Sequence, residues 1–205
     1  MSHFTPLQTE IYDLDILKKT LNDLKFEFQE NRNLSGKQGQ MERVDIAIGE
    51  IGDYYFGFKR RKEGVTYEIR GPMEYLENKN VKRMVREVLQ EYSYQKILHE
   101  TQKRGFALIQ EERLEAGSIK LVLRKVPEWK GAREKMEQLI VTIKDGMVEI
   151  EVEGAQGTRY LGLTQAIENL IGHVDGRSLK NDFYRGTKID QGIYLKQSRF
   201  ENFER

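Results

Sequence analysis

Cysteine is absent from this chain of 205 residues. That absence excludes disulfides, thiolate catalysis, and zinc or iron–sulfur sites ligated by cysteine. The three histidines (His3, His99 and His173) lie too far apart in the sequence to form a recognisable metal motif. Only three prolines occur and no segment is of low complexity, so we expect most of the chain to fold.

Long apolar runs are also missing. No apolar stretch approaches the roughly 18 residues that indicate a membrane-spanning helix, and the first residues lack the apolar core of a signal peptide. We therefore expect a soluble, cytoplasmic protein with no membrane segment.

Neither sign of charge is in excess. The chain has 34 Lys and Arg residues against 33 Asp and Glu residues, and together they make up 33% of the sequence, compared with about 25% in a typical domain. A balanced surface favours solubility and argues against a protein that wraps nucleic acid by bulk charge.

The strongest local pattern is a predicted hairpin at 138–153. Apolar and polar residues alternate on both sides of Asp145-Gly146, and Asp-Gly between such runs is typical of a two-residue hairpin turn. We predict a division of the chain at this point. The predicted parts are an α+β domain at 1–126, a linker at 127–135, a ββα module at 136–185 with its helix at 162–173, and a C-terminal tail at 186–205.

The first part mixes strand and helix patterns. Asp13 is placed to cap a helix whose leucines recur at helical spacing through Leu24, and a long second helix is predicted at 73–103. Residues 31–40 are predicted to be a polar loop. We expect an α+β fold with a mainly antiparallel sheet, two helices on one face, and the appended ββα unit. The predicted strands of the first part are 4–11, 25–29, 43–49, 53–60, 65–70, 106–112 and 118–125.

Several short motifs are spread over residues 1–125. They are Thr9-x-Ile11-x-Asp13, Gly36-x-x-Gly39-Gln40, Val44-Asp45-Ile46, Tyr54-Tyr55-Phe56-Gly57-Phe58, Gln90-x-Tyr92-Ser93-Tyr94-Gln95-Lys96 and Arg104-Gly105-Phe106. In combination they resemble the hypothetical chloroplast open reading frame thirty-five family, a domain of unknown function found in plastids, cyanobacteria and other bacteria. The family usually has other residues where Tyr55, Ser93 and Gln95 stand.

Residues 136–185 resemble a second small uncharacterised family, with a hairpin, a glycine loop at Gly154 to Gly157, and a helix. That family commonly has a cysteine where Arg159-Tyr160 stands here. In bacteria the two families tend to be encoded side by side, often near an AAA-type ATPase. The resemblance therefore implies that the two parts work together, and it makes an AAA-type ATPase a candidate partner. It implies no established activity.

A run of four basic residues, Lys59, Arg60, Arg61 and Lys62, follows an aromatic-rich segment. Basic groups beside aromatic rings can hold phosphates while the rings stack on bases. The same alternation is also typical of core aromatics beside solvated charges. Nucleic acid is not the favoured ligand, because four residues supply only a few phosphate contacts.

A second candidate surface lies on the long predicted helix. Tyr92, Lys96 and His99 have the spacing i, i+4 and i+7, which places them on one helical face. Lys96 there could bind an anionic group that Tyr92 orients. In the alternative interpretation, Tyr92 is a core residue covered by the alkyl stem of Lys96, and His99 is solvated.

Three classes of function stay open. The first is a non-enzymatic adaptor that docks on a protein partner through the appended module and tail. The second is a binding module for nucleic acid or a phosphate-bearing small molecule, centred on residues 59–62 and on the helix face. The third is an enzyme, which the sequence does not favour because no catalytic residue, metal site or cofactor is indicated. The oligomeric state is not predicted.

Overall fold

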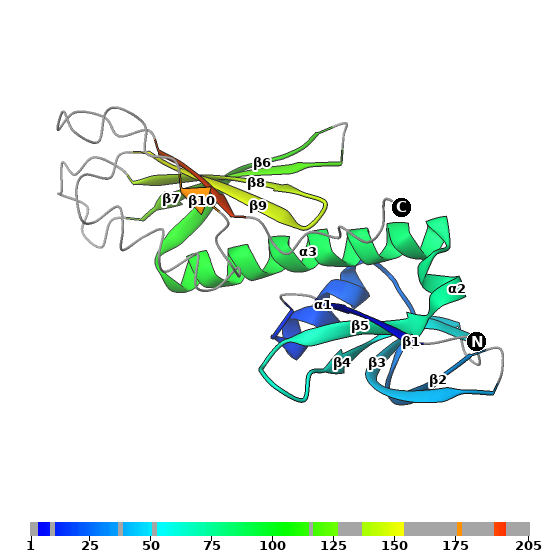
Figure 1. The fold of residues 1–205 in the computed structure, drawn as a ribbon. Coiled ribbons are helices and arrows are strands. Elements are labelled where there is room, and N and C mark those ends of the chain that lie inside the picture. The colour runs from blue at the N-terminus through cyan, green and yellow to red at the C-terminus, as the bar shows by residue number, and fades with distance from the viewer. Residues whose placement is uncertain are drawn as a thin grey trace. The chain divides into compact units, whose positions relative to one another are not determined.

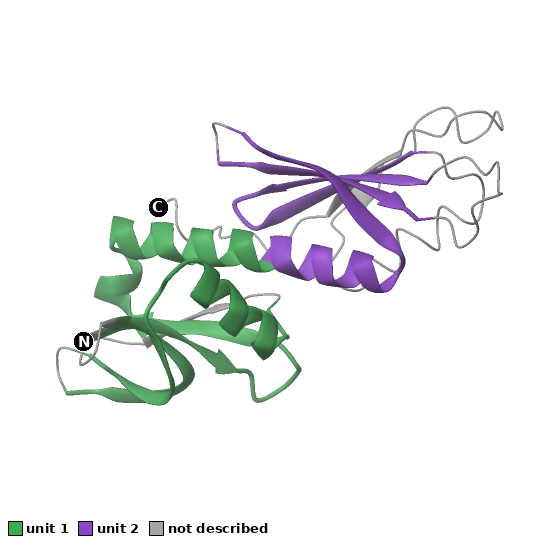
Figure 2. Ribbon diagram, turned by 180° about the vertical axis from the view of Figure 1, so that it is seen from behind, with its two compact units in different colours: residues 1–92, 198–205 green, residues 93–197 purple. Residues whose placement is uncertain are grey.

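The computed structural model describes two compact units, shown in Figure 2. The first contains the described residues up to Tyr92, and the second begins at Ser93. The division between the units therefore falls inside the helix at 79–103. The domain boundaries predicted from the sequence, at 126 and 136, stay a prediction. The described residues are 4–8, 11–36, 39–50, 53–114, 117–126, 137–153, 176–177 and 191–195.

The first unit contains an antiparallel sheet with the strand order β1-β5-β4-β3-β2 (Figure 1). Consecutive strands β2, β3, β4 and β5 are neighbours, and β1 adds to the far side of β5. The strand bounds are Phe4–Gln8 for β1, Phe28–Ser35 for β2, Met41–Glu50 for β3, Asp53–Arg60 for β4 and Tyr67–Pro72 for β5.

Two helices pack on one face of this sheet. Helix α1 spans Leu14–Asp23, and α3 spans Lys79–Lys103, of which the part up to Tyr92 belongs to this unit. As predicted, Asp13 caps α1: its Oδ1 accepts a hydrogen bond from the Ile16 N–H at 3.1 Å. The buried core combines both helices with the sheet and includes Leu17, Leu21, Ile46, Ile48, Phe56, Phe58, Ile69, Val81, Val85 and Val88.

The predicted helix at 73–103 is two helices. A short α2 covers Met73–Leu76, and α3 begins after Asn78. The break is stabilised locally, because Asn78 Oδ1 accepts the Asn80 N–H at 2.8 Å and its carbonyl accepts the Lys82 N–H at 2.9 Å. Asn78 is therefore the N-cap of α3, and the apolar spacing alone did not reveal this interruption.

The second unit contains an antiparallel sheet with the order β10-β11-β9-β8-β7-β6. Ser93–Lys103 of α3 belongs to this unit, and Ile97 packs into its core. One face of the central strands supplies most of that core, for example Leu121, Leu139 and Ile150. The strand bounds are Phe106–Arg113 for β6, Ile119–Lys125 for β7, Gln138–Lys144 for β8, Met147–Glu153 for β9, Gly176–Arg177 for β10 and Gln191–Leu195 for β11.

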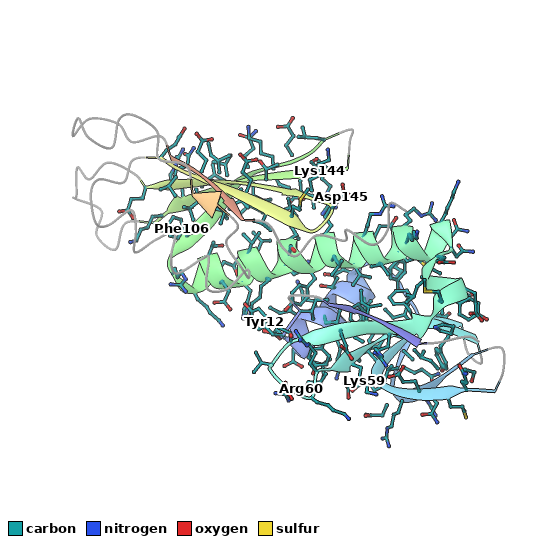
Figure 3. The ribbon with its side chains drawn as sticks, viewed as in Figure 1. Tyr12, Lys59, Arg60, Phe106, Lys144 and Asp145 are labelled. Atoms are coloured by element: carbon teal, nitrogen blue, oxygen red, sulfur yellow. The ribbon has the colours of Figure 1, made fainter. Side chains whose placement is uncertain are left out.

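The predicted hairpin at 138–153 is confirmed as β8 and β9. Lys144 pairs with Met147 across a two-residue turn in which Asp145 has φ 51° and Gly146 has φ 80°. Positive φ at both positions is the geometry that Asp-Gly favours, and its twist matches that of the flanking strands. The labelled Lys144 and Asp145 mark this turn in Figure 3.

The α+β class and the antiparallel pairing are confirmed. Among the described residues, β6 and β7 pair with the hairpin of the predicted appended unit and not with the sheet of the first unit. The predicted loop at 31–40 is wrong in its first half, because β2 continues to Ser35. The strand predicted at 25–29 begins only at Phe28, and that predicted at 4–11 ends at Gln8. The polar residues of β2 hid its strand character, since most of its side chains face solvent.

Part of the predicted tail also belongs to a sheet. Residues Gln191–Leu195 form β11, which pairs antiparallel with β9. The predicted linker at 127–135 and the predicted helix at 162–173 lie outside the described residues. Within the described ranges, no helix is both long and apolar enough to cross a membrane.

Candidate functional site

The basic run occupies the end of β4 and the turn that follows it. The turn is closed by a hydrogen bond from the Arg61 N–H to the Thr66 carbonyl at 3.0 Å, and Gly64 adopts φ 116° within it. The Arg60 N–H donates to Asp45 Oδ2 at 2.7 Å, which ties the end of β4 to β3. Arg60 and Lys62 are exposed and Arg61 is half-buried; Lys59 and Arg60 are labelled in Figure 3.

Lys59 differs from the other three basic residues because it belongs to an ion-pair network. Its Nζ lies 3.0 Å from Glu42 Oε1, and the same oxygen accepts Arg70 Nη2 at 2.7 Å and Arg70 Nε at 2.8 Å. Arg70 also lies 3.6 Å from Glu68. Strands β3, β4 and β5 thus meet around one carboxylate, and two of the nearby cations are partly neutralised.

The ion-pair network changes the pKa of Glu42. Burial opposes ionisation of its carboxyl group, but the hydrogen bonds and charges of Arg70 and Lys59 outweigh burial and hold the pKa of Glu42 below its ordinary value. Its Oε2 is buried and has no hydrogen-bond partner among the described residues, which is consistent with the cost of burial. The network therefore favours structural ion pairing over capture of an external anion.

The aromatic side chains before the basic run are mostly part of the core. Phe56 and Phe58 are fully buried, and their rings meet edge to face with centroids 6.0 Å apart. Tyr54 and Tyr55 are half-buried, and Tyr55 packs edge to face on Tyr75. The two phenylalanine rings therefore have no free face on which a base could stack.

Tyr92, the first residue of the predicted helix face, forms hydrogen bonds within the first unit. Its side chain is buried, and its hydroxyl oxygen accepts the backbone N–H groups of Tyr12 at 3.3 Å and of Asp13 at 3.1 Å. These two amides precede α1, so the hydroxyl joins the start of α1 to α3 over a sequence separation of about 80 residues. Tyr12 is labelled in Figure 3.

Lys96 and His99 lie in the second unit. Lys96 Nζ pairs with Glu100 Oε1 at 3.2 Å, and the two side chains are only 6% and 12% exposed. Burial pushes the pKa of Glu100 upward, but Lys96, assisted by Lys103 and His99, holds it below its ordinary value. His99 is exposed. The three residues of the predicted face thus belong to two units. Tyr92 forms its hydrogen bonds within the first unit, and Lys96 pairs with Glu100 within the second.

The sequence patterns did not single out β6, a strand that exposes large apolar side chains. Among the described residues this strand pairs on one side only, with β7, so it forms the edge of its sheet. Leu108 and Ile109 are 37% and 52% exposed, and Leu114 just after the strand is 40% exposed. The available signal was the unbroken apolar run Ala107-Leu108-Ile109, which departs from alternation.

A β-bulge explains that departure. Leu108 pairs with Leu123 and Gln110 with Val122, so Ile109 is the extra residue on β6. Bulges at sheet edges re-aim a side chain and interrupt the regular ladder. The consequence is an extra apolar residue on the edge strand, Ile109, whose side chain is largely exposed.

Contacts on the other side of the bulge anchor β6 to α3. The Tyr94 hydroxyl donates to Glu111 Oε2 at 2.8 Å, and Arg113 Nε donates to Glu111 Oε1 at 3.1 Å. The Arg113 guanidinium also lies 5.5 Å from the centroid of the Tyr94 ring. The exposed leucine and isoleucine therefore lie on a strand that is held to α3.

In the described part of the chain, no group of three or more acidic or histidine side chains is arranged to hold a metal ion.

Fold and surface together define an α+β protein with an antiparallel sheet in each of two units and an apolar sheet edge in the second. Comparison with known proteins places this chain in a family. A family model described as "Protein of unknown function (DUF1257)" matches residues 20–122, which is half of the chain, so the chain belongs to that family. A second model, "Protein of unknown function (DUF2997)", matches residues 139–184.

Curated relatives agree with this assignment, and they confirm the resemblance found in the sequence. Each bears the name "Uncharacterized protein ycf35". The relative from Cyanophora paradoxa is 36% identical over 127 residues, which is 61% of this chain and 98% of the relative. Those from Guillardia theta and Pyropia yezoensis are 32% identical over the same shares. No solved structure matches this chain.

Proposed function

We propose that this protein is a non-enzymatic adaptor that docks on a protein partner through the β6 edge. The observation that supports the proposal is the exposure of Leu108 and Ile109 on a supported edge strand. An edge strand carries unpaired N–H and C=O groups that can accept a strand from another chain, and apolar side chains beside them add affinity. This moves the docking surface from the module and tail favoured by the sequence to the strand at 106–113.

The partner class and the compartment are parts of the same proposal. The resemblance to the two families makes an AAA-type ATPase the first partner to test, and a cytoplasmic location is retained from the sequence. A protein partner is favoured over a small ligand because the exposed apolar groups lie along an edge.

The experiment compares two exposed apolar positions in the full-length chain. Ile109→Asp places a charge on the β6 edge, and Val65→Asp places one in the turn between β4 and β5, where Val65 is 64% exposed. Tagged proteins are used to capture partners from the native host, with mass spectrometry as the readout, and purified AAA-type ATPase is then tested directly. We expect Ile109→Asp to lose the partner and Val65→Asp to keep it.

Retention of an unchanged partner list by Ile109→Asp contradicts the proposal, provided that circular dichroism shows both variants to be folded. Deleting residues 136–205 is the less informative experiment. That deletion removes β8 and β9 from the sheet that contains β6, so loss of a partner would not distinguish a lost contact from a lost fold.

A second candidate function is binding of a phosphate-bearing ligand at the basic turn. The observation in its favour is that no ion pair with a described residue engages the side chains of Arg60, Arg61 or Lys62, in contrast to Lys59. The same capture experiment separates the two candidates when it includes Arg60→Glu with Arg61→Glu. The adaptor proposal expects this variant to keep its protein partner, whereas the alternative expects it to lose a salt-sensitive association with nucleic acid or nucleotide.

A further inference from the structure

The pairing of β7 with β8 joins the parts of the chain that match two different families. The first match ends at residue 122, inside β7, and the second begins at residue 139, inside β8. These two strands form six register pairs, from Ile119–Ile143 to Arg124–Gln138. The sheet of the second unit is therefore assembled from strands of both family matches.

The junction between these strands is packed like a protein core. Leu121 lies opposite Val141 and Leu123 opposite Leu139, and all four side chains are fully buried in one cluster. Such burial contributes about 25 cal/mol per Å² of apolar surface removed from water. The β7–β8 pair is thus a hydrophobic seam as well as a set of backbone hydrogen bonds.

Polar contacts close one end of the seam. Arg124 Nη2 donates to Gln138 Oε1 at 3.3 Å, the Lys125 N–H donates to the Glu137 carbonyl at 2.9 Å, and Lys125 Nζ lies 3.4 Å from Glu137 Oε2. These contacts join the last residues of β7 to the first residues of β8 and the residue before it. They set the register without using the covalent connection through residues 127–136.

The length of the relatives shows that the first module occurs without the second. Their match of 127 residues covers 98% of each relative, which leaves almost no length for a counterpart of residues 139–184. Without β8, the β6–β7 hairpin keeps Ile97 of α3 as a packing partner, but Leu121 and Leu123 lose the buried side chains of β8 and the paired strand beside them. The free edge of β7 therefore fits a second polypeptide that presents an alternating apolar strand.

We infer that the β7–β8 seam is a protein–protein interface contained within one chain. Residues 1–126 bind residues 137–205 through the seam, and the binding does not need the peptide connection between them. The partner that fits β7 is a hairpin whose first strand carries apolar residues at the positions of Leu139, Val141 and Ile143. The inference is independent of the proposed adaptor function, because the seam does not involve the free edge of β6.

The test begins with the full-length protein. A protease recognition sequence is inserted between residues 130 and 131, and the folded protein is cut there. We expect the two pieces to stay together as a 1:1 complex in size-exclusion chromatography and native mass spectrometry. After separation in urea, they should reassociate when mixed. Separation of the pieces in native buffer, with the uncut protein still folded, overturns the inference.

Two neighbouring substitutions identify the surface that holds the pieces together. Val141→Ala removes a buried seam side chain, and Thr142→Ala changes the next residue on β8, which is half-buried on the other face. We expect Val141→Ala to raise the Kd of the cut complex roughly tenfold or more, and Thr142→Ala to raise it less than about threefold. Equal effects of the two substitutions overturn the seam as the interface.

A milder variant covers the case in which Val141→Ala prevents folding of the uncut chain. Ile143→Val removes one methylene-sized group from the same row, and Ile143 is likewise fully buried opposite Ile119. The expected increase in Kd is roughly twofold to tenfold. No increase for this variant, in a cut complex that otherwise associates, contradicts binding through the apolar row.

Discussion

At the scale of single residues, Glu42 is the group whose environment has the clearest consequence for pH. One of its oxygens accepts hydrogen bonds from Lys59 and Arg70, and these cations keep the pKa of the folded carboxyl group below its ordinary value of 4.5 despite burial. A lowered folded pKa means that the ionised group stabilises the folded state above the unfolded pKa. This stabilisation is lost as the pH falls through the folded pKa.

Glu42→Gln is therefore expected to lower the free energy of unfolding at pH 7, and the difference from the unsubstituted protein should shrink as the solution is acidified below about pH 4.5. Urea unfolding at pH 7 and at pH 3 measures both quantities. Glu63→Gln, in the exposed turn after β4, is the matched control and should have little effect at either pH. A difference for Glu42→Gln that persists unchanged at pH 3 contradicts the prediction.

Individual residues differ in how far the sequence predicts their roles. The capping role of Asp13 was predictable because its bond to Ile16 spans three residues. For Tyr92, the interpretation as a core residue is confirmed by its burial. The partners of its hydroxyl were not predictable, because the amides that donate to it belong to Tyr12 and Asp13, far away in the sequence. Its hydroxyl is directed by packing, which a single sequence does not specify.

At the scale of elements, the start of α3 depends on one side chain. Asn78 Oδ1 satisfies the Asn80 N–H, which would otherwise have no partner within the first turn of the helix. We expect Asn78→Ala to lower the free energy of unfolding by about 1 kcal/mol, measured by urea unfolding followed by circular dichroism.

Asn80→Ala is the control for this prediction. Asn80 is exposed in the same first turn, but it contributes its backbone N–H and not its side chain to the cap. Alanine is also the better helix former, so this substitution should be neutral or slightly stabilising. Equal loss of stability in the two variants would show that the capping bond is not the cause.

The elements that were predicted well are those whose signal is local. The turn at Asp145-Gly146 has both its residues and its flanking alternation within one short segment, and the hairpin was confirmed. The strand β2 was partly missed because its residues 30–33 are polar and exposed, so neither periodicity nor hydrophobicity marked it. Its strand geometry comes from pairing with β3.

At the scale of the whole molecule, the second sheet depends on strands from both family matches. A chain cut back to residues 1–126 keeps β6 and β7 but loses β8 and β9. We expect the amides of residues 106–125 to exchange with deuterium much faster in this chain than in the full protein, because the β6–β7 hairpin loses its pairing with β8 and the buried side chains of β8 and β9.

Hydrogen–deuterium exchange followed by mass spectrometry tests this expectation, with the full chain under the same conditions as reference. The amides of the first unit, residues 11–92, should keep their protection, because the buried core formed by the described residues of that unit ends at Tyr92. Equal protection of residues 106–125 in both chains is the contradicting result.

The sequence by itself determined the α+β class, the hairpin turn, the cap of α1 and the two family modules, because each depends on residues close together in the chain. The tertiary structure decided which strands share a sheet, and hence that the predicted joint between modules is crossed by the β7–β8 seam. It also decided that β6 is an edge with Leu108 and Ile109 exposed. The physical reason is that alternation specifies which face of a strand is buried but not which strand lies beside it.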